Sequence, residues 1–130
     1  MEKTEKSYHV IFVALLCLYS LSHGMGLLRE LFYVLSELGT SYNIYNIIVH
    51  IVGLIIVFLF FAFNKAGYYI FVAIQILNPI IITSMAGDGM VHLSVSLLHL
   101  VIIHLVMLLR KNGKNAYKTL DVFKVGLFES

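Results

Sequence analysis

The stretch NIYNIIVHIVGLIIVFLFFAF, residues 43–63, decides the fold because it carries no charged side chain from end to end. A helix needs about 20 mostly apolar residues to cross a hydrocarbon core of about 30 Å, and this stretch is long enough. Three comparable stretches lie at residues 8–28, 68–85 and 91–109. We therefore predict an all-α, polytopic membrane protein whose four transmembrane helices form a bundle with short loops.

The composition of the chain supports the same fold class. Of its 130 residues, 60% are hydrophobic and 12% are charged, whereas globular domains average about 45–50% and about 25%. A water-soluble chain this apolar has too few polar groups to cover its surface. The spans use most of residues 1–130, so we expect a single domain without a soluble catalytic part, which favours a non-enzymatic role.

The segment after the first span, LLRELFYVLSELG at residues 27–39, mixes apolar and polar residues at helical spacing. It predicts a short amphipathic helix that either extends the first span or lies in the interface plane. We expect Glu30, Glu37 and Asp88 on outer loops, which leaves the membrane core without an acidic residue. That absence argues against a small four-helix multidrug exporter, because such exporters depend on a glutamate in the first helix.

The positions of lysine and arginine predict the orientation. With the N-terminus inside, the inner segments hold eight of the nine basic residues, and Arg29 alone lies outside. We therefore expect both termini to be cytoplasmic, with residues 110–130 as a basic cytoplasmic tail, in a bacterial-type inner or plasma membrane. The first span has the basic start of a signal peptide, and we expect it to be retained as an anchor.

Histidines are the most unusual polar residues in the predicted spans. The rise of a helix places His23, His50 and His99 in the outer half of the membrane, with His92 at the outer mouth. His92, Ser96 and His99 are spaced i, i+4 and i+7, so they share one helix face. We expect His50 and His99 to face each other or a shared cavity.

Several kinds of site fit these histidines. Two on facing helices would clamp the iron of haem b, and three would hold a transition metal. A proton path is a third interpretation, because histidine titrates near neutral pH. Interhelical hydrogen bonding is the structural alternative. The sequence contains no HExxH, CxxC or haem-attachment motif, so a redox protein, a small transporter and a proton pathway all stay open as alternatives.

The third span contains a second polar group, formed by Gln75, Asn78 and Pro79. Proline lacks an N–H, and its ring clashes with the carbonyl four residues earlier, which here belongs to Gln75. A kink at this point would expose backbone polarity and line a cavity. The alternative is a tolerated kink whose polar groups are satisfied by neighbouring side chains.

Two pairs of small residues in the first span, Ser20 with Gly24 and Ser22 with Gly26, predict close packing between helices. Our leading hypothesis is therefore a small membrane protein that acts through assembly, as a homo-oligomer or as an accessory subunit of a larger complex. Its expected partners are the lipid bilayer and either a second copy or another membrane protein, and nucleic acid is not among them.

Overall fold

The computed structural model describes residues 8–87, 89–111 and 114–120. Its main elements are four long helices: α1 (Val10–Leu35), α2 (Ser41–Phe61), α3 (Ala66–Ala86) and α4 (Gly89–Met107). Each of the four is long and apolar enough to cross a membrane. A short antiparallel hairpin follows, made of β1 (Arg110–Lys111) and β2 (Lys114–Asn115), and the helix α5 (Ala116–Leu120) closes the described chain. The all-helical class and the four apolar helices expected from the sequence are confirmed.

The first helix extends further than the expected span. Residues 27–35 continue α1 without a break, since no glycine or proline occurs between Gly26 and Gly39. The amphipathic segment is therefore an extension of the first helix and not a separate one. Our placement of Glu30 on an outer loop was consequently wrong, because this residue lies inside α1 and its side chain is buried.

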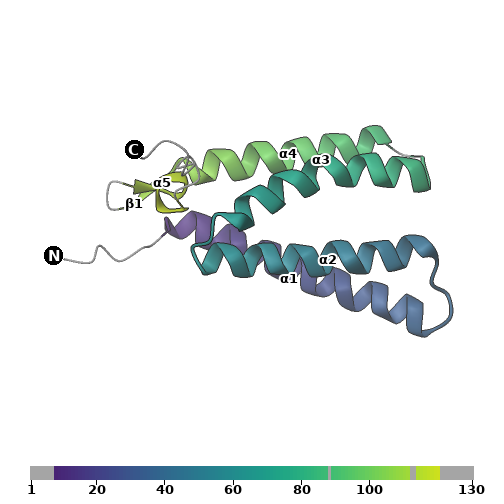
Figure 1. Ribbon diagram of the computed structural model, residues 1–130. Helices are drawn as coiled ribbons and strands as arrows, with labels where there is room; N and C mark the ends of the chain where they lie inside the picture. The colour runs from purple at the N-terminus through teal and green to yellow at the C-terminus, as the bar shows by residue number, and fades with distance from the viewer. Residues whose placement is uncertain (1–7, 88, 112–113, 121–130) are drawn as a thin grey trace, which may run out of the picture.

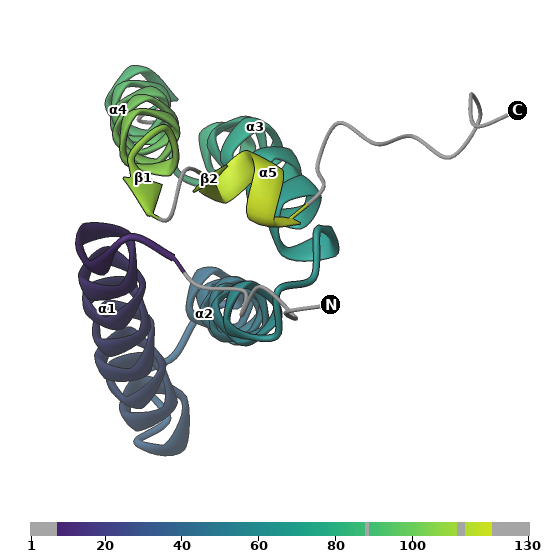
Figure 2. The same cartoon turned by 90° about the vertical axis from the view of Figure 1, so that its left-hand side faces the viewer.

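The four helices form two hairpins. Helix α1 packs along α2, α3 packs along α4, and α2 contacts α3, whereas α1 and α4 touch little. The hairpins lie close together at the end that carries α5 and spread apart toward the opposite end (Figure 1). Viewed from the α5 end, the four helices surround a common centre (Figure 2). This arrangement produces one closely packed end and one open end.

Aromatic side chains fill the packed end. The Tyr8 hydroxyl donates to the Phe60 carbonyl oxygen at 2.7 Å, and Phe12 meets Phe60 edge to face at 5.5 Å between ring centroids. Helix α5 covers this cluster with Tyr117 and Leu120, both buried. Burial raises the pKa of Tyr117 to about 12, so its hydroxyl stays protonated at neutral pH. Residues 116–120 of the expected tail thus pack onto the bundle, and residues 112–113 and 121–130 lie outside the described part.

The distribution of polar side chains is the reverse of that in a water-soluble protein. Large apolar residues such as Leu28, Phe58 and Leu105 are exposed on the outer faces of the helices. Glu30 and Gln75, in contrast, are buried between helices. Such a surface suits helices that are surrounded by lipid.

Phe60 and Phe58 provide a test of the packed end, because they lie on the same helix with exposed fractions of 1% and 70%. We expect Phe60→Ala to lower the free energy of unfolding by about 3 kcal/mol, since the lost ring leaves a cavity among the aromatic side chains. Phe58→Ala should change it by less than about 1 kcal/mol. Unfolding in mixed micelles monitored by circular dichroism measures both, and equal losses would contradict this core.

Candidate functional site

Two histidines form the central contact between α1 and α2. The Nδ1 atoms of His23 and His50 are 3.0 Å apart, which is a hydrogen bond in which one nitrogen carries the hydrogen and the other accepts it. In the neutral pair the two rings therefore hold opposite tautomers. The contact joins two of the sequence-derived candidate residues in a single group.

A glycine on each helix makes room for the histidine of the other. A methyl group at Gly26 would overlap the His50 ring, and one at Gly53 would lie 2.5 Å from Cε1 and Nδ1 of His23. In both helices the glycine follows the histidine by three residues, so the contact is reciprocal. Gly26 belongs to a predicted packing pair, but Gly53 was missed, because no second small residue stands four positions from it.

Glu30 forms a second polar contact on the same face of α1, seven residues or about 10 Å from His23. Its carboxylate accepts hydrogen bonds from Arg29 (Nε at 3.0 Å) and from the Asn43 side-chain amide at 2.6 Å. Asn43 in turn accepts from the backbone N–H of Thr40, which caps α2. The side chain of Glu30 is fully engaged between α1 and α2, and its residue is 2% exposed.

A cavity of about 420 Å³ lies among all four helices, beside the histidine pair. That volume falls in the range of small-molecule pockets, about 300–1,000 Å³. Its polar wall consists of eight side chains: Tyr19, Ser22, His23, Gln75, Asn78, His92, Ser96 and His99. The remaining lining is apolar. Sequence reasoning identified seven of these eight positions and missed Tyr19, which looks like an ordinary aromatic residue of a span.

One face of α4 supplies His92, Ser96 and His99 to this wall. Ser96 is only 5% exposed. Among the described residues, 8–87, 89–111 and 114–120, none of these three side chains has a hydrogen-bond partner. Their hydrogen-bonding capacity is therefore open to whatever occupies the cavity.

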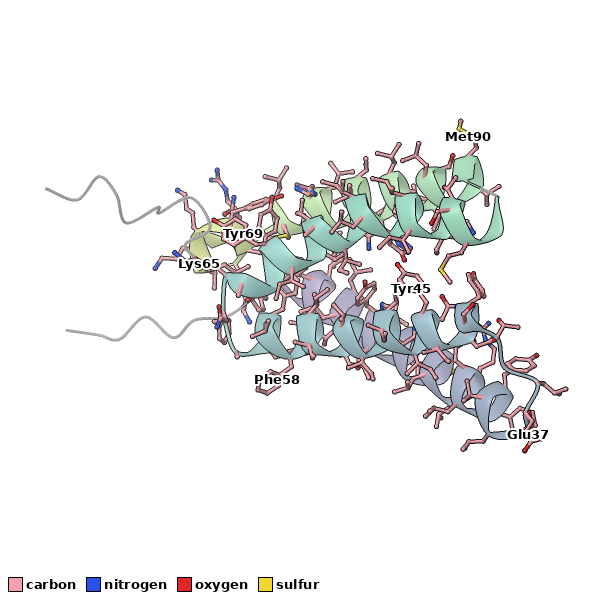
Figure 3. The ribbon with its side chains drawn as sticks, turned by 45° about the vertical axis from the view of Figure 1, so that its right-hand side comes forward. Glu37, Tyr45, Phe58, Lys65, Tyr69 and Met90 are labelled. Carbon is pink, nitrogen blue, oxygen red and sulfur yellow. The ribbon has the colours of Figure 1, made fainter. Side chains whose placement is uncertain are left out.

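Helix α3 forms the wall opposite α1 and runs through Pro79 as one helix. Gln75 is buried at the cavity, and Asn78 accepts a hydrogen bond of 2.7 Å from the Tyr45 hydroxyl. Figure 3 shows Tyr45 reaching from α2 toward the other hairpin. The Thr83 hydroxyl donates to the carbonyl of Pro79 at 2.5 Å. Gln75 and Asn78 thus line the cavity, while Pro79 borders a shallow hollow of about 510 Å³ between α3 and α4.

The remaining candidates lie elsewhere. His50 contacts His23 but does not line the cavity. His99 therefore shares the cavity with His23, and not with His50 as expected from the sequence. A further histidine, His104, is not one of the candidates; it lies near the packed end, where its Nδ1 donates to the Leu100 carbonyl at 2.6 Å and Tyr68 contacts its Nε2 at 3.1 Å. Gly24 faces open space, since a methyl group there would meet nothing within 4 Å.

The geometry does not fit haem iron clamped axially between His23 and His50. Axial ligands bind haem iron from opposite sides, so two bonds of about 2 Å separate their nitrogens by about 4 Å. The observed 3.0 Å is a direct hydrogen bond. Across the part of the chain that the structure describes, no three His, Cys, Asp or Glu side chains are grouped to hold a metal ion.

Comparisons of the chain with protein-family models, with curated proteins and with solved structures found no match. The function is therefore argued from the cavity and its polar contacts.

The reciprocal contact predicts opposite effects for two neighbouring glycines of α1. Gly26→Ala should destabilise the fold by about 1–3 kcal/mol, because the added methyl group forces the His50 ring away from its place. Gly24→Ala should be neutral or should stabilise by up to about 1 kcal/mol, since alanine favours a helix and nothing obstructs it. Unfolding in mixed micelles measures both changes.

A double-mutant cycle serves as the control for this prediction. In the His50→Ala background the ring is gone, so Gly26→Ala should lose most of its penalty. If the penalty stays the same in both backgrounds, the two residues are not in contact as described.

Proposed function

We propose that this chain is a multi-pass membrane protein that takes a small molecule into the cavity among its four helices, as a small transporter does. The observation that carries the proposal is the face of α4 with His92, Ser96 and His99, whose polar atoms face the cavity without a partner in the described chain. Lipid cannot hydrogen-bond such groups, and leaving them unpaired costs about 1–3 kcal/mol each. Water or a polar ligand must therefore occupy the space.

The shape of the bundle supports access from one side. Near α5, the aromatic cluster of Phe12, Phe60 and Tyr117 is closely packed. At the other end the hairpins spread apart, and His92 lies in the first turns of α4 there. A cavity closed at one end and approached from the other resembles one state of an alternating-access protein.

The charges favour an orientation in which the open end faces outward. Five basic residues of the described chain lie at the α5 end or in the turn beside it: Lys65, Arg110, Lys111, Lys114 and Lys118. Figure 3 shows Lys65 at that end and Glu37 at the far one. Because basic loops stay in the cytoplasm, we place the α5 end and both termini inside and the cavity mouth outside.

Labelling of cysteines tests both the cavity and its orientation. In a Cys17→Ser background, Ser96→Cys should react with a membrane-impermeant, cationic thiosulfonate added from outside, because the cavity admits water. Val101→Cys lies on the same helix but is exposed on the outer surface away from the cavity lining. It should stay unmodified, since lipid keeps its thiol from ionising. Equal reactivity at the two positions, or reaction of Ser96→Cys from the inside alone, would refute the proposal.

Assembly is a second candidate function, favoured by Gly24. This glycine and Ser20 lie one turn apart on α1, and no atom of the described residues fills the space beside Gly24. Helix α1 also makes little contact with α4. Small residues on an open helix face allow another helix to approach closely, so we propose that a second copy packs here.

Substitution of Gly24 by a large residue tests this assembly. Gly24→Leu should convert the wild-type oligomer to monomer in native mass spectrometry, because the side chain blocks the close approach. Leu21→Ala alters the exposed surface of the same helix without adding bulk and should leave the oligomer intact. A wild-type protein that is monomeric in mild detergent would exclude self-assembly.

A further inference from the structure

We propose that the ligand of the cavity is a small amphipathic monocarboxylate, bound together with one proton that the His23–His50 pair takes up. This inference rests on the proposed function and adds the chemical class of the ligand. It is carried by the charge of the wall, by the hydrogen-bond geometry of the histidine pair and by the apolar part of the lining.

The wall is uncharged but protonatable. The sixteen positions that line the cavity include no Asp, Glu, Lys or Arg, and they include three histidines. A cationic ligand would find no carboxylate there, since Glu30 is occupied by Arg29 and Asn43 outside the lining. An anion, in contrast, meets donors on His92, Ser96 and His99, and its burial becomes favourable when a nearby imidazole gains a proton.

The hydrogen-bonded pair is suited to take up one proton. In the neutral pair, the donating ring has an unprotonated Nε2, and a proton added there leaves the Nδ1–H···Nδ1 bond intact. A second proton would have to occupy the accepting Nδ1 and would break the bond. His23 is the member that lines the cavity, so it presents the added charge to the ligand.

Side chains from three helices surround the pair, and those from two of the helices are titratable. Helix α1 contributes Tyr19, whose ring lies against His23 at 4.2 Å between centroids, and the Arg29–Glu30 pair near His50. Helix α4 contributes His99, which interacts electrostatically with His23. Helix α3 presents the uncharged Gln75 and Asn78. Glu30 is the one acidic group among these neighbours, and Arg29 balances its charge, so the charge that favours a proton on the pair comes from the bound anion.

The apolar lining selects the rest of the ligand. Leu15, Phe71 and Ile103 form the deep part of the cavity, next to the packed core. An apolar tail placed there gains burial of about 25 cal/mol per Å² relative to water. The carboxylate then points to the polar residues of α4, which makes a compact acid with an apolar body the best match.

Binding of three matched probes tests the class of ligand. Benzoate, benzamide and benzylamine have the same ring and differ in charge, and titration calorimetry of the protein in nanodiscs, with empty nanodiscs subtracted, measures each. We expect benzoate to bind at least tenfold more tightly than benzamide or benzylamine at pH 6. Its affinity should fall by up to tenfold per pH unit between pH 6 and 8, with uptake of about one proton per benzoate, because the proton is bound with the anion.

Two variants locate the proton. His23→Gln keeps a hydrogen-bonding side chain but cannot be protonated, so it should bind benzamide as the wild type does and lose the pH dependence and proton uptake for benzoate. His104→Gln lies outside the cavity and should behave as the wild type. If His23→Gln retains the pH dependence, the pair is not the proton acceptor and the proposal fails.

The other outcomes separate this inference from the proposed function. Equal binding of the three probes, or preference for benzylamine, overturns the monocarboxylate assignment. Absence of any binding overturns it as well. In each of these cases, labelling of Ser96→Cys from outside still decides independently whether the cavity is open to small molecules.

Discussion

The reciprocal contact of two histidines with two glycines determines how α1 lies against α2. His23 occupies the space beside Gly53, and His50 occupies the space beside Gly26. A methyl group at either glycine would force the facing imidazole from its place, so the two contacts fix the register of the hairpin at this point. The same register aligns Glu30 with Asn43 two turns away, because both pairs follow one antiparallel arrangement.

The position of the cavity follows from that contact. The hydrogen bond to His50 uses one nitrogen of His23 and leaves its other ring edge on the cavity wall. Near α5, large aromatic side chains such as Phe12 and Phe60 fill the space between the hairpins. Farther along, the facing positions carry smaller polar residues such as Ser22 and Ser96, which do not fill it. The contrast between large apolar and small polar side chains along one bundle therefore produces a sealed half and a hollow half.

The sequence predicts the helices well because apolar length alone defines them. The expected spans and the observed helices differ mainly at α1, where the first span was expected to end at residue 28 and the segment after it either to extend that span or to lie in the interface. Those two side chains pair with each other, and Asn43 completes their hydrogen bonding, so the helix continues. Such a compensation depends on a residue of another helix and is not visible in the local pattern.

The candidate site was predictable in part for a similar reason. The spacing of His92, Ser96 and His99 defines one face of a single helix, so sequence alone groups them, and all three line the cavity. The pairing of His23 with His50 depends on the rotation of two helices about their axes. That rotation is set by Gly53, which has no side chain and belongs to no small-residue pair in the sequence.

Glu30 overturns one premise of the sequence argument about function. The sequence argument against a multidrug exporter assumed that no acidic residue lies inside the helices, yet Glu30 lies within α1 and is buried. A carboxylate that recruits a cationic substrate must face the substrate and be free to change partners. The carboxylate of Glu30 is held by Arg29 on one oxygen and by Asn43 on the other, and it does not line the cavity. Its charge is already balanced by a cation of the same helix, so the residue stabilises the hairpin, and the polar groups that line the cavity are the uncharged and protonatable side chains of α1, α3 and α4.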